Sequence, residues 1–224
     1  MIALAVVAIV LAVLIPFGIE AVKRPRLRIE PDVWSAEGPV GWVFAVVRVR
    51  NRPLGLPWSL LLRRDSATGC ELTAEFREKG QQALKLPEIR CRWSATPQPI
   101  RYVLPSRALQ EIPDGPGPSA MTTAHYGPRF EFDPQAVSES YRLDVAPSDE
   151  GYEAAIAILL PDTGAFAFSA ESYAHSFAKP EWRLKHGEYE VTVKAQSGQT
   201  RATAVFSLPY LTEDFARFRL VTVS

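Results

Sequence analysis

The chain has few of the residues on which most catalytic and metal sites depend. Its 224 residues include three histidines, two cysteines and a single asparagine, Asn51. Two cysteines without a CxxC spacing cannot complete a four-ligand zinc site, and Asn51 lies in Asn-Arg-Pro, which is not an N-glycosylation motif. The sequence also lacks GxSxG, HExxH, Walker A and GxGxxG motifs. We therefore predict that the protein is not an enzyme and has no catalytic residue, cofactor or metal site.

The chain also lacks an excess of charge of either sign. Its 25 basic side chains balance 25 acidic ones, and the net charge is zero. Nucleic-acid-binding domains typically carry a strong basic excess. We therefore expect no nucleic-acid partner.

The longest hydrophobic run lies at the N-terminus, where residues 2–19 are 18 consecutive apolar or helix-compatible residues. As an α-helix at ~1.5 Å per residue, this run would reach about 27 Å, close to the ~30 Å thickness of the bilayer core. Four basic residues follow the run closely: Lys23, Arg24, Arg26 and Arg28. We predict that residues 1–24 form a single-pass transmembrane anchor with a basic flank.

Two other interpretations of this run stay open. A cleaved signal peptide would need a basic start and a small-residue cleavage site, and Ile19-Glu20-Ala21 is a poor site, although Pro16 resembles the break that often precedes one. A buried core helix would normally have a polar stripe, which this run lacks.

The flanking charges predict the orientation of the anchor. Basic residues beside a span tend to stay in the cytoplasm, and here they all follow the span. We therefore expect a cytoplasmic domain, in which Cys70 and Cys91 would be buried free thiols. In an extracytoplasmic domain the same two cysteines could pair.

From residue 27 onward the hydrophobic pattern has mainly a period of two, which is typical of half-buried antiparallel strands. The alternating segments are residues 27–30, 43–50, 70–77, 89–94, 141–145, 189–195 and 202–208. Residues 153–160 would also suit a helix, but the turn signal at 161–164 and the apolar segment 165–170 favour a hairpin. The pattern predicts an all-β antiparallel domain over residues 25–210.

Two segments fit this pattern less well. Residues 96–119 contain six prolines and are expected to be irregular, either as a linker between two subdomains or as a long crossover within one. The tail of residues 211–224 is too apolar to lie free in solvent, and we expect it to pack as an added strand.

One motif resembles a known family. Leu184, Gly187 and Tyr189 form an LxxGxY pattern directly before the most regular strand. This pattern is similar to the tyrosine corner of immunoglobulin-like and fibronectin type III-like Greek-key β-sandwiches. The resemblance implies a Greek-key sandwich, a tight turn at Gly187, and a Tyr189 hydroxyl bonded to backbone upstream. Val191 stands where an antibody domain has cysteine, so the likeness is to the broad superfamily.

The remaining candidate residues are weak. His125, His175, His186 and the acidic pairs Asp149-Glu150 and Glu213-Asp214 lie in predicted loops, where such residues are usually solvated. Trp34, Trp42, Trp93 and Trp182 lie in or beside strands and are expected in the core or on a sheet face. Trp58 lies in an apolar loop, where it either contacts a ligand or partner or folds back onto the core.

Two classes of function fit these features. The first is a membrane-tethered, non-enzymatic interaction or structural module with an unknown protein partner. The second is an extracytoplasmic domain that binds carbohydrate or cell-wall material through aromatic side chains. A basic-flanked anchor followed by such a domain resembles membrane-anchored bacterial proteins of unassigned role, and fold-level likeness does not carry function.

Overall fold

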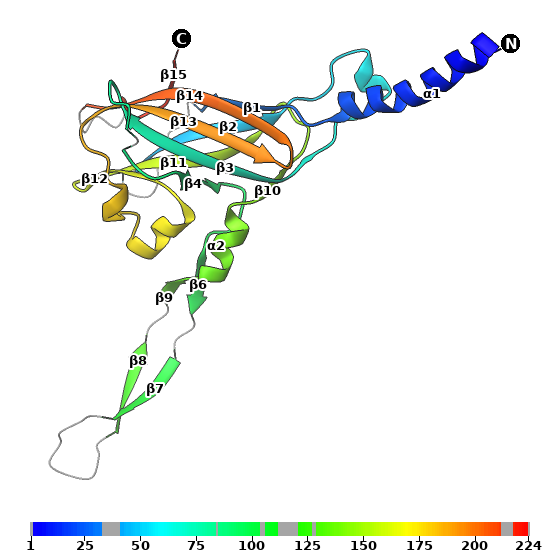
Figure 1. Ribbon diagram of the computed structural model, residues 1–224. Helices are drawn as coiled ribbons and strands as arrows, with labels where there is room; N and C mark the ends of the chain where they lie inside the picture. The colour runs from blue at the N-terminus through cyan, green and yellow to red at the C-terminus, as the bar shows by residue number, and fades with distance from the viewer. Residues whose placement is uncertain are drawn as a thin grey trace.

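Two antiparallel β-sheets form the body of the computed structural model (Figure 1). The structure describes residues 2–32, 41–83, 85–103, 106–111, 121–126, 129–211 and 217–223. The strands of the first sheet are β1 (Leu27–Pro31), β2 (Val43–Asn51), β5 (Arg92–Trp93), β11 (Tyr152–Leu160) and β12 (Gly164–Ala167). The strands of the second sheet are β3 (Ala67–Glu78), β4 (Ile89–Arg90), β10 (Leu143–Val145), β13 (Gly187–Ser197), β14 (Thr200–Tyr210) and β15 (Val221–Thr222).

Neighbouring strands in each sheet include both consecutive strands and strands far apart in the sequence. The first sheet runs β1–β2–β11–β12, with β5 pairing with β11, and the second runs β10–β3–β13–β14–β15, with β4 pairing with β3. The predicted all-β antiparallel class is therefore confirmed, and the arrangement is compatible with a β-sandwich. The predicted hairpin is also confirmed, because β11 and β12 pair from Ala157↔Ala167 to Leu160↔Gly164.

The hydrophobic core lies between the sheets because side chains alternate along each strand. In β13, Tyr189, Val191 and Val193 are buried, while Glu190 and Thr192 between them are only partly covered. Strand β11 is buried along nearly its whole length. Its second face packs against an aromatic cluster beside the short 3-10 helices η2 (Ala170–His175) and η3 (Pro180–Trp182).

The tyrosine corner has the predicted hydrogen bonds. The Tyr189 hydroxyl accepts from the Lys185 amide at 2.9 Å and donates to the Lys185 carbonyl oxygen at 2.9 Å. The ring is only 1% exposed. Gly187 is not required by strain or space, because its φ lies outside the left-handed region and a Cβ there would approach nothing closer than Glu78 Oε1 at 4.0 Å.

Both cysteines lie in the core. Cys70 and Cys91 are free thiols with no exposed surface. Burial raises the pKa of Cys70 to about 12 and raises that of Cys91 as well. Both side chains therefore remain neutral thiols at physiological pH.

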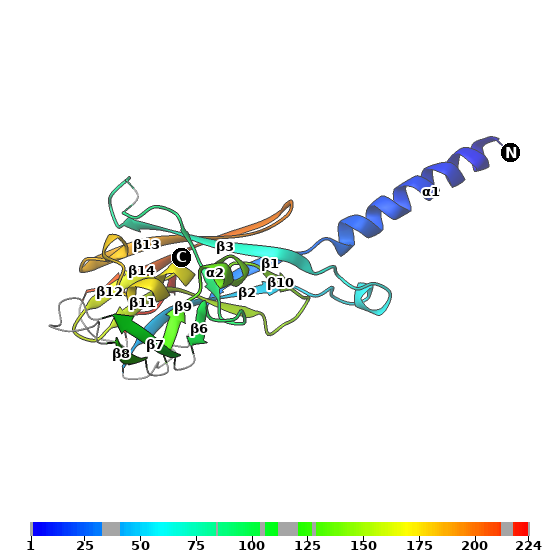
Figure 2. The ribbon, with the colours of Figure 1, turned by 90° about the horizontal axis from the view of Figure 1, so that it is seen from below.

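The N-terminal helix α1 (Ile2–Lys23) projects from one end of the sandwich (Figures 1 and 2). Its side chains are described continuously from Leu14 onward, and these ten residues reach about 15 Å at ~1.5 Å per residue. Among the described residues, no helix combines the length and apolarity needed to cross a membrane. The span predicted for residues 2–19 is thus not found.

A buried asparagine organises the junction between α1 and the sheets. The Asn51 side-chain oxygen accepts from the Arg26 amide at 3.0 Å. Its amide nitrogen donates to the carbonyl oxygens of Asp65 at 2.8 Å and Val145 at 3.2 Å. The Asp65 amide in turn donates to the Lys23 carbonyl at the end of α1. One side chain of β2 therefore bonds the segments just before β1 and β3, and also β10, beside the helix.

Residues 100–132 contain a two-stranded ribbon that stands away from both sheets (Figure 1). Its strands are β6 (Ile100–Val103), β7 (Ser106–Glu111), β8 (Met121–Tyr126) and β9 (Arg129–Phe132). Strand β6 pairs with β9, and β7 pairs with β8. The irregular structure predicted for residues 96–119 is therefore wrong at β6 and β7, which are strands.

Candidate functional site

The base of the ribbon is fixed to the sandwich by buried hydrogen bonds. The Trp93 indole nitrogen donates to the carbonyl oxygens of Cys70 at 3.0 Å and Tyr141 at 3.2 Å. The Thr96 hydroxyl donates to the carbonyl oxygens of Trp93 at 2.7 Å and Ser140 at 3.1 Å. The chain therefore leaves and re-enters the sandwich next to a fully buried tryptophan.

The two arms of the ribbon meet where the short helix α2 (Pro134–Ser140) begins. The Asp133 amide donates to the Pro99 carbonyl oxygen at 2.9 Å, which joins the outgoing and returning chains. The Asp133 carboxylate accepts from the Gln135 amide at 3.0 Å and caps the helix, and Pro134 occupies the first turn, where its missing N–H costs nothing. The position of the ribbon's base is thus fixed from both sides.

Beyond this base the ribbon has no third strand among the described residues. Its pairs run from Ile100↔Phe132 to Val103↔Arg129, and then from Ser106↔Tyr126 to Glu111↔Met121. A two-stranded hairpin without a packed face is only marginally stable, and open strand edges are templates for pairing with another chain. The ribbon is therefore the strongest candidate for a protein-binding element.

A small cavity opens beside the base of the ribbon. Its volume is about 180 Å³, and its lining includes Phe44, Arg92, Gln98, Phe168 and Tyr173. The Arg92 guanidinium lies 5.7 Å from the centroid of the Tyr173 ring, and burial lowers its pKa. Ligand sites are usually about 300–1,000 Å³, so this cavity has room for a single side chain of a partner.

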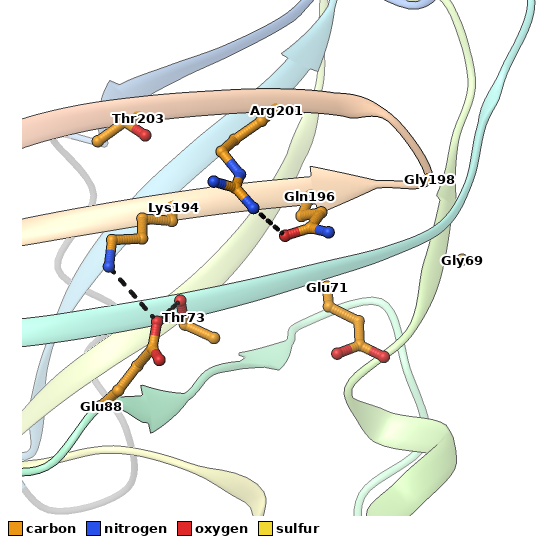
Figure 3. Close-up of a pocket in the computed structure, with 9 residues that line it drawn as sticks. All are labelled: Gly69, Glu71, Thr73, Glu88, Lys194, Gln196, Gly198, Arg201 and Thr203. Atoms are coloured by element: carbon orange, nitrogen blue, oxygen red, sulfur yellow. Dashed lines mark hydrogen bonds and ion pairs between the residues drawn. The ribbon is translucent and has the colours of Figure 1, made fainter.

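A larger groove crosses the outer face of the second sheet (Figure 3). It has a volume of about 620 Å³ and is lined by residues of β3, β13 and β14 and their neighbouring loops: Gly69, Glu71, Thr73, Glu88, Lys194, Gln196, Gly198, Arg201 and Thr203. These residues come from the outward-facing positions of the strands. The groove is consequently polar.

The charges of this groove largely compensate one another. Lys194 pairs with Glu75 and lies 3.7 Å from Glu88. Arg142 bonds Glu71 at 2.7 Å and, together with Arg90, holds the pKa of Glu71 below its usual range. The hydrogen bond to Glu75 raises the pKa of Lys194. Glu71 and Lys194 therefore keep their charges near neutral pH, so neither is suited to general acid–base chemistry there.

The structure does not bring the candidate residues from the sequence together in one site. His175 is exposed, and the His186 ring stacks on Tyr210 at 4.5 Å. Asp149 and Glu150 are exposed on a loop. The side chain of His125, on β8, and the pair Glu213-Asp214 lie outside the described residues. Across the described ranges, no group of three or more metal-ligating side chains occurs.

The tryptophans mostly have structural positions. Trp93 and Trp182 are buried, as expected, and Trp42 packs on Phe177 with ring centroids 5.0 Å apart. Trp58 is 52% exposed, and Trp34 lies outside the described residues. Among the described aromatic side chains only Phe17 and Trp58 are exposed, so they form no aromatic shelf for a sugar.

Comparisons with protein-family models, curated proteins and solved structures each found no match to this chain. The likeness to immunoglobulin-like domains therefore depends on the Tyr189 corner and on the antiparallel sheets. Neither feature assigns a function by itself.

Proposed function

We propose that this protein is a membrane-tethered, non-enzymatic interaction module that engages a protein partner through the ribbon of residues 100–132. In this proposal an immunoglobulin-like Greek-key sandwich is the scaffold and the ribbon is the binding element. The observation that carries the proposal is the ribbon itself, which stands away from the sheets on a rigidly bonded base (Figure 1).

The open strand edges of the ribbon favour pairing with a strand of a partner protein. Its backbone groups are paired on one side of each strand, and no described strand pairs with the other side. A partner strand added to such an edge would form main-chain hydrogen bonds without disturbing the sandwich. The small cavity beside Arg92 and Tyr173 lies at the base of the same surface and would accept one side chain of that partner.

The tether is proposed from the composition of the N-terminus. The apolar run of residues 2–19 and the basic residues Lys23, Arg24, Arg26 and Arg28 favour a membrane-held helix with the domain in the cytoplasm. The position of α1 agrees with this role, because the helix points away from the sandwich (Figure 2). The balanced charges support a protein partner rather than a nucleic acid.

Site-specific photo-crosslinking in cells tests the proposal. A photoreactive amino acid is placed at Leu109 or Thr123, on the two strands of the outer ribbon, in the full-length chain. The matched control positions are Gln82 and Arg219, which are exposed on the sandwich. We expect the same discrete cross-linked protein from both ribbon positions and none from the controls. Ribbon positions that give no product in a membrane-localised, folded protein would contradict the proposed binding role.

A further inference from the structure

The surface beside the C-terminal half of α1 is unusually apolar. The loop of residues 53–62, here called the apolar loop, contains a cis peptide bond before Pro57 and the short helix η1 (Trp58–Leu60). Leu56, Leu60 and Leu61 are each about four-fifths exposed, at 78%, 78% and 80%. Isolated exposed leucines are ordinary, but several on one loop mark an interaction surface.

The apolar loop and α1 form one continuous surface. A groove of about 500 Å³ lies between them, lined by Ile15, Gly18, Ile19, Val22, Trp58, Leu61 and Leu62. On α1, Leu14, Ile15 and Phe17 are exposed as well. Tryptophan and leucine at the edge of such a surface are typical of segments that lie in the headgroup region of a bilayer.

Basic groups border this surface where the helix joins the sandwich. Lys23 ends the helix, Arg24 and Arg26 follow it, and Arg63 and Arg64 follow the apolar loop. Arg63 and Arg64 line a second cavity of about 450 Å³, together with Ser59 and Ser66. The border is therefore complementary to the negative charge of anionic lipid headgroups, at roughly 1 kcal/mol for each basic residue near the surface.

Arg64 has the environment of a side chain that binds an anion. The side chain is only 8% exposed, and its Nη1 donates to the Arg24 carbonyl oxygen. Its Nε is buried and has no hydrogen-bond partner among the described residues. Burial, together with the nearby charge of Arg26, lowers the pKa of Arg64. A phosphate in the cavity that Arg64 lines would supply the negative charge that the guanidinium lacks beside Arg26.

We infer that the apolar loop inserts into the headgroup region of the membrane that holds α1, and that Arg63 and Arg64 bind the phosphate of an anionic lipid there. This inference rests on the proposed membrane tether and adds a second, lipid-specific contact to it. The occupant is the bilayer because the apolar surface, its tryptophan and its basic border are continuous with α1.

An environment-sensitive fluorophore at a single new cysteine tests the insertion. Leu60→Cys places the probe on the apolar loop. Gln82→Cys places a matched probe on the exposed loop after β3, a strand whose other end lies beside α1. Cys70 and Cys91 are fully buried, so the folded full-length chain is labelled at the introduced site. The protein is reconstituted with vesicles of phosphatidylcholine alone or with added phosphatidylglycerol, and flotation measures membrane association.

We expect the probe at position 60 to shift to the blue and brighten in the phosphatidylglycerol vesicles, while the probe at position 82 does not change. If the chain floats and both probes behave alike, the loop contact is wrong and the tether stands. A chain that fails to float overturns both proposals. A blue shift without vesicles that grows with protein concentration would assign the surface to a second copy of the chain instead.

Charge variants test the headgroup site. The response of the position-60 probe reports the apparent affinity of the protein for phosphatidylglycerol vesicles. Arg63→Gln should lower this affinity about five-fold, and Arg64→Gln should lower it at least as much. Arg219→Gln, an exposed arginine of the sandwich, is the control and should have no effect. Because Arg64 also bonds backbone, the Arg63 variant keeps the test valid if the Arg64 variant folds poorly. Equal affinities of the Arg63 variant and the wild type would overturn the headgroup site.

Discussion

The β13–β14 hairpin and the ribbon of residues 100–132 are built from the same antiparallel ladder but have opposite surroundings. The β13–β14 hairpin has eleven registered pairs, a neighbouring strand in β3, and an inward face that includes Tyr189 and Phe206 in the core. The ribbon has a comparable ladder and no described neighbour. Because burial rather than pairing supplies most of the stability, the first hairpin holds the fold, and the second is the element that we propose for binding.

The largest effect should follow a change at the point where the two regions meet. Trp93→Ala removes a fully buried side chain and its two hydrogen bonds, and should lower the free energy of unfolding by about 3–5 kcal/mol. Trp58→Ala, at a half-exposed position, should change it by less than about 0.5 kcal/mol. Urea denaturation of the two variants measures the difference. Equal losses would show that Trp93 does not anchor the ribbon to the core.

The core should also weaken in alkali through its buried thiols. The pKa of Cys70 is about 12 in the folded chain and about 8.5 for an exposed thiol, so its contribution is complete below about pH 8.5 and is lost as the pH rises toward 12. By about pH 10 this loss amounts to roughly 2 kcal/mol. Denaturation of the wild type and of Cys70→Ala between about pH 8 and 10 compares their slopes, and parallel profiles would contradict the prediction.

A smaller effect should follow loss of the tyrosine corner, which joins β13 to the chain before it. Tyr189→Phe keeps the ring and removes both hydrogen bonds to Lys185, at an expected cost of about 1–3 kcal/mol. Tyr210→Phe is the control, because the Tyr210 hydroxyl has no hydrogen bond among the described residues and should matter little. Urea denaturation measures the free energy of unfolding of both variants. An unchanged value for Tyr189→Phe would show that the hydrogen bonds of Tyr189 do not stabilise the fold.

The smallest effect should follow removal of the ribbon. The chain ends at Pro99 and Asp133 are already joined by a hydrogen bond, so an Asn-Gly turn can replace residues 100–132. We expect the free energy of unfolding to change by less than about 1 kcal/mol, because no strand of the two sheets pairs with the described strands of the ribbon. Calorimetry of the shortened chain measures this. A large loss, or loss of a cooperative transition, would mean that the ribbon belongs to the folding unit.

The antiparallel strands could be predicted from the sequence because their signals are local. Alternation in residues 189–195 and 202–208 predicts β13 and β14, and the LxxGxY pattern predicts the hydrogen bonds of Tyr189. Cys70 and Cys91 likewise lie at buried positions of alternating segments, residues 70–77 and 89–94. In each of these cases the residues that form the sequence pattern are also the residues that form the structural element.

The candidate sites could not be predicted because their residues are joined only by the fold. Six prolines made residues 96–119 look irregular, and proline count does not distinguish a linker from a ribbon that tolerates proline at its edges. The groove of Figure 3 collects outward-facing residues from three strands that have no distinctive pattern of their own. Asn51 is distinguished in the sequence only as the single asparagine, and no local pattern indicates its position at the junction.

The junction at Asn51 also has a mechanical consequence. Only three residues separate the end of α1 at Lys23 from the start of β1 at Leu27, and hydrogen bonds from Asn51, Arg64 and Asp65 fasten that connection to both sheets. A rotation or tilt of the helix is therefore transmitted to the sandwich instead of being absorbed by a linker. Whatever holds α1 thereby sets the direction in which the ribbon points and the height at which a partner must approach it.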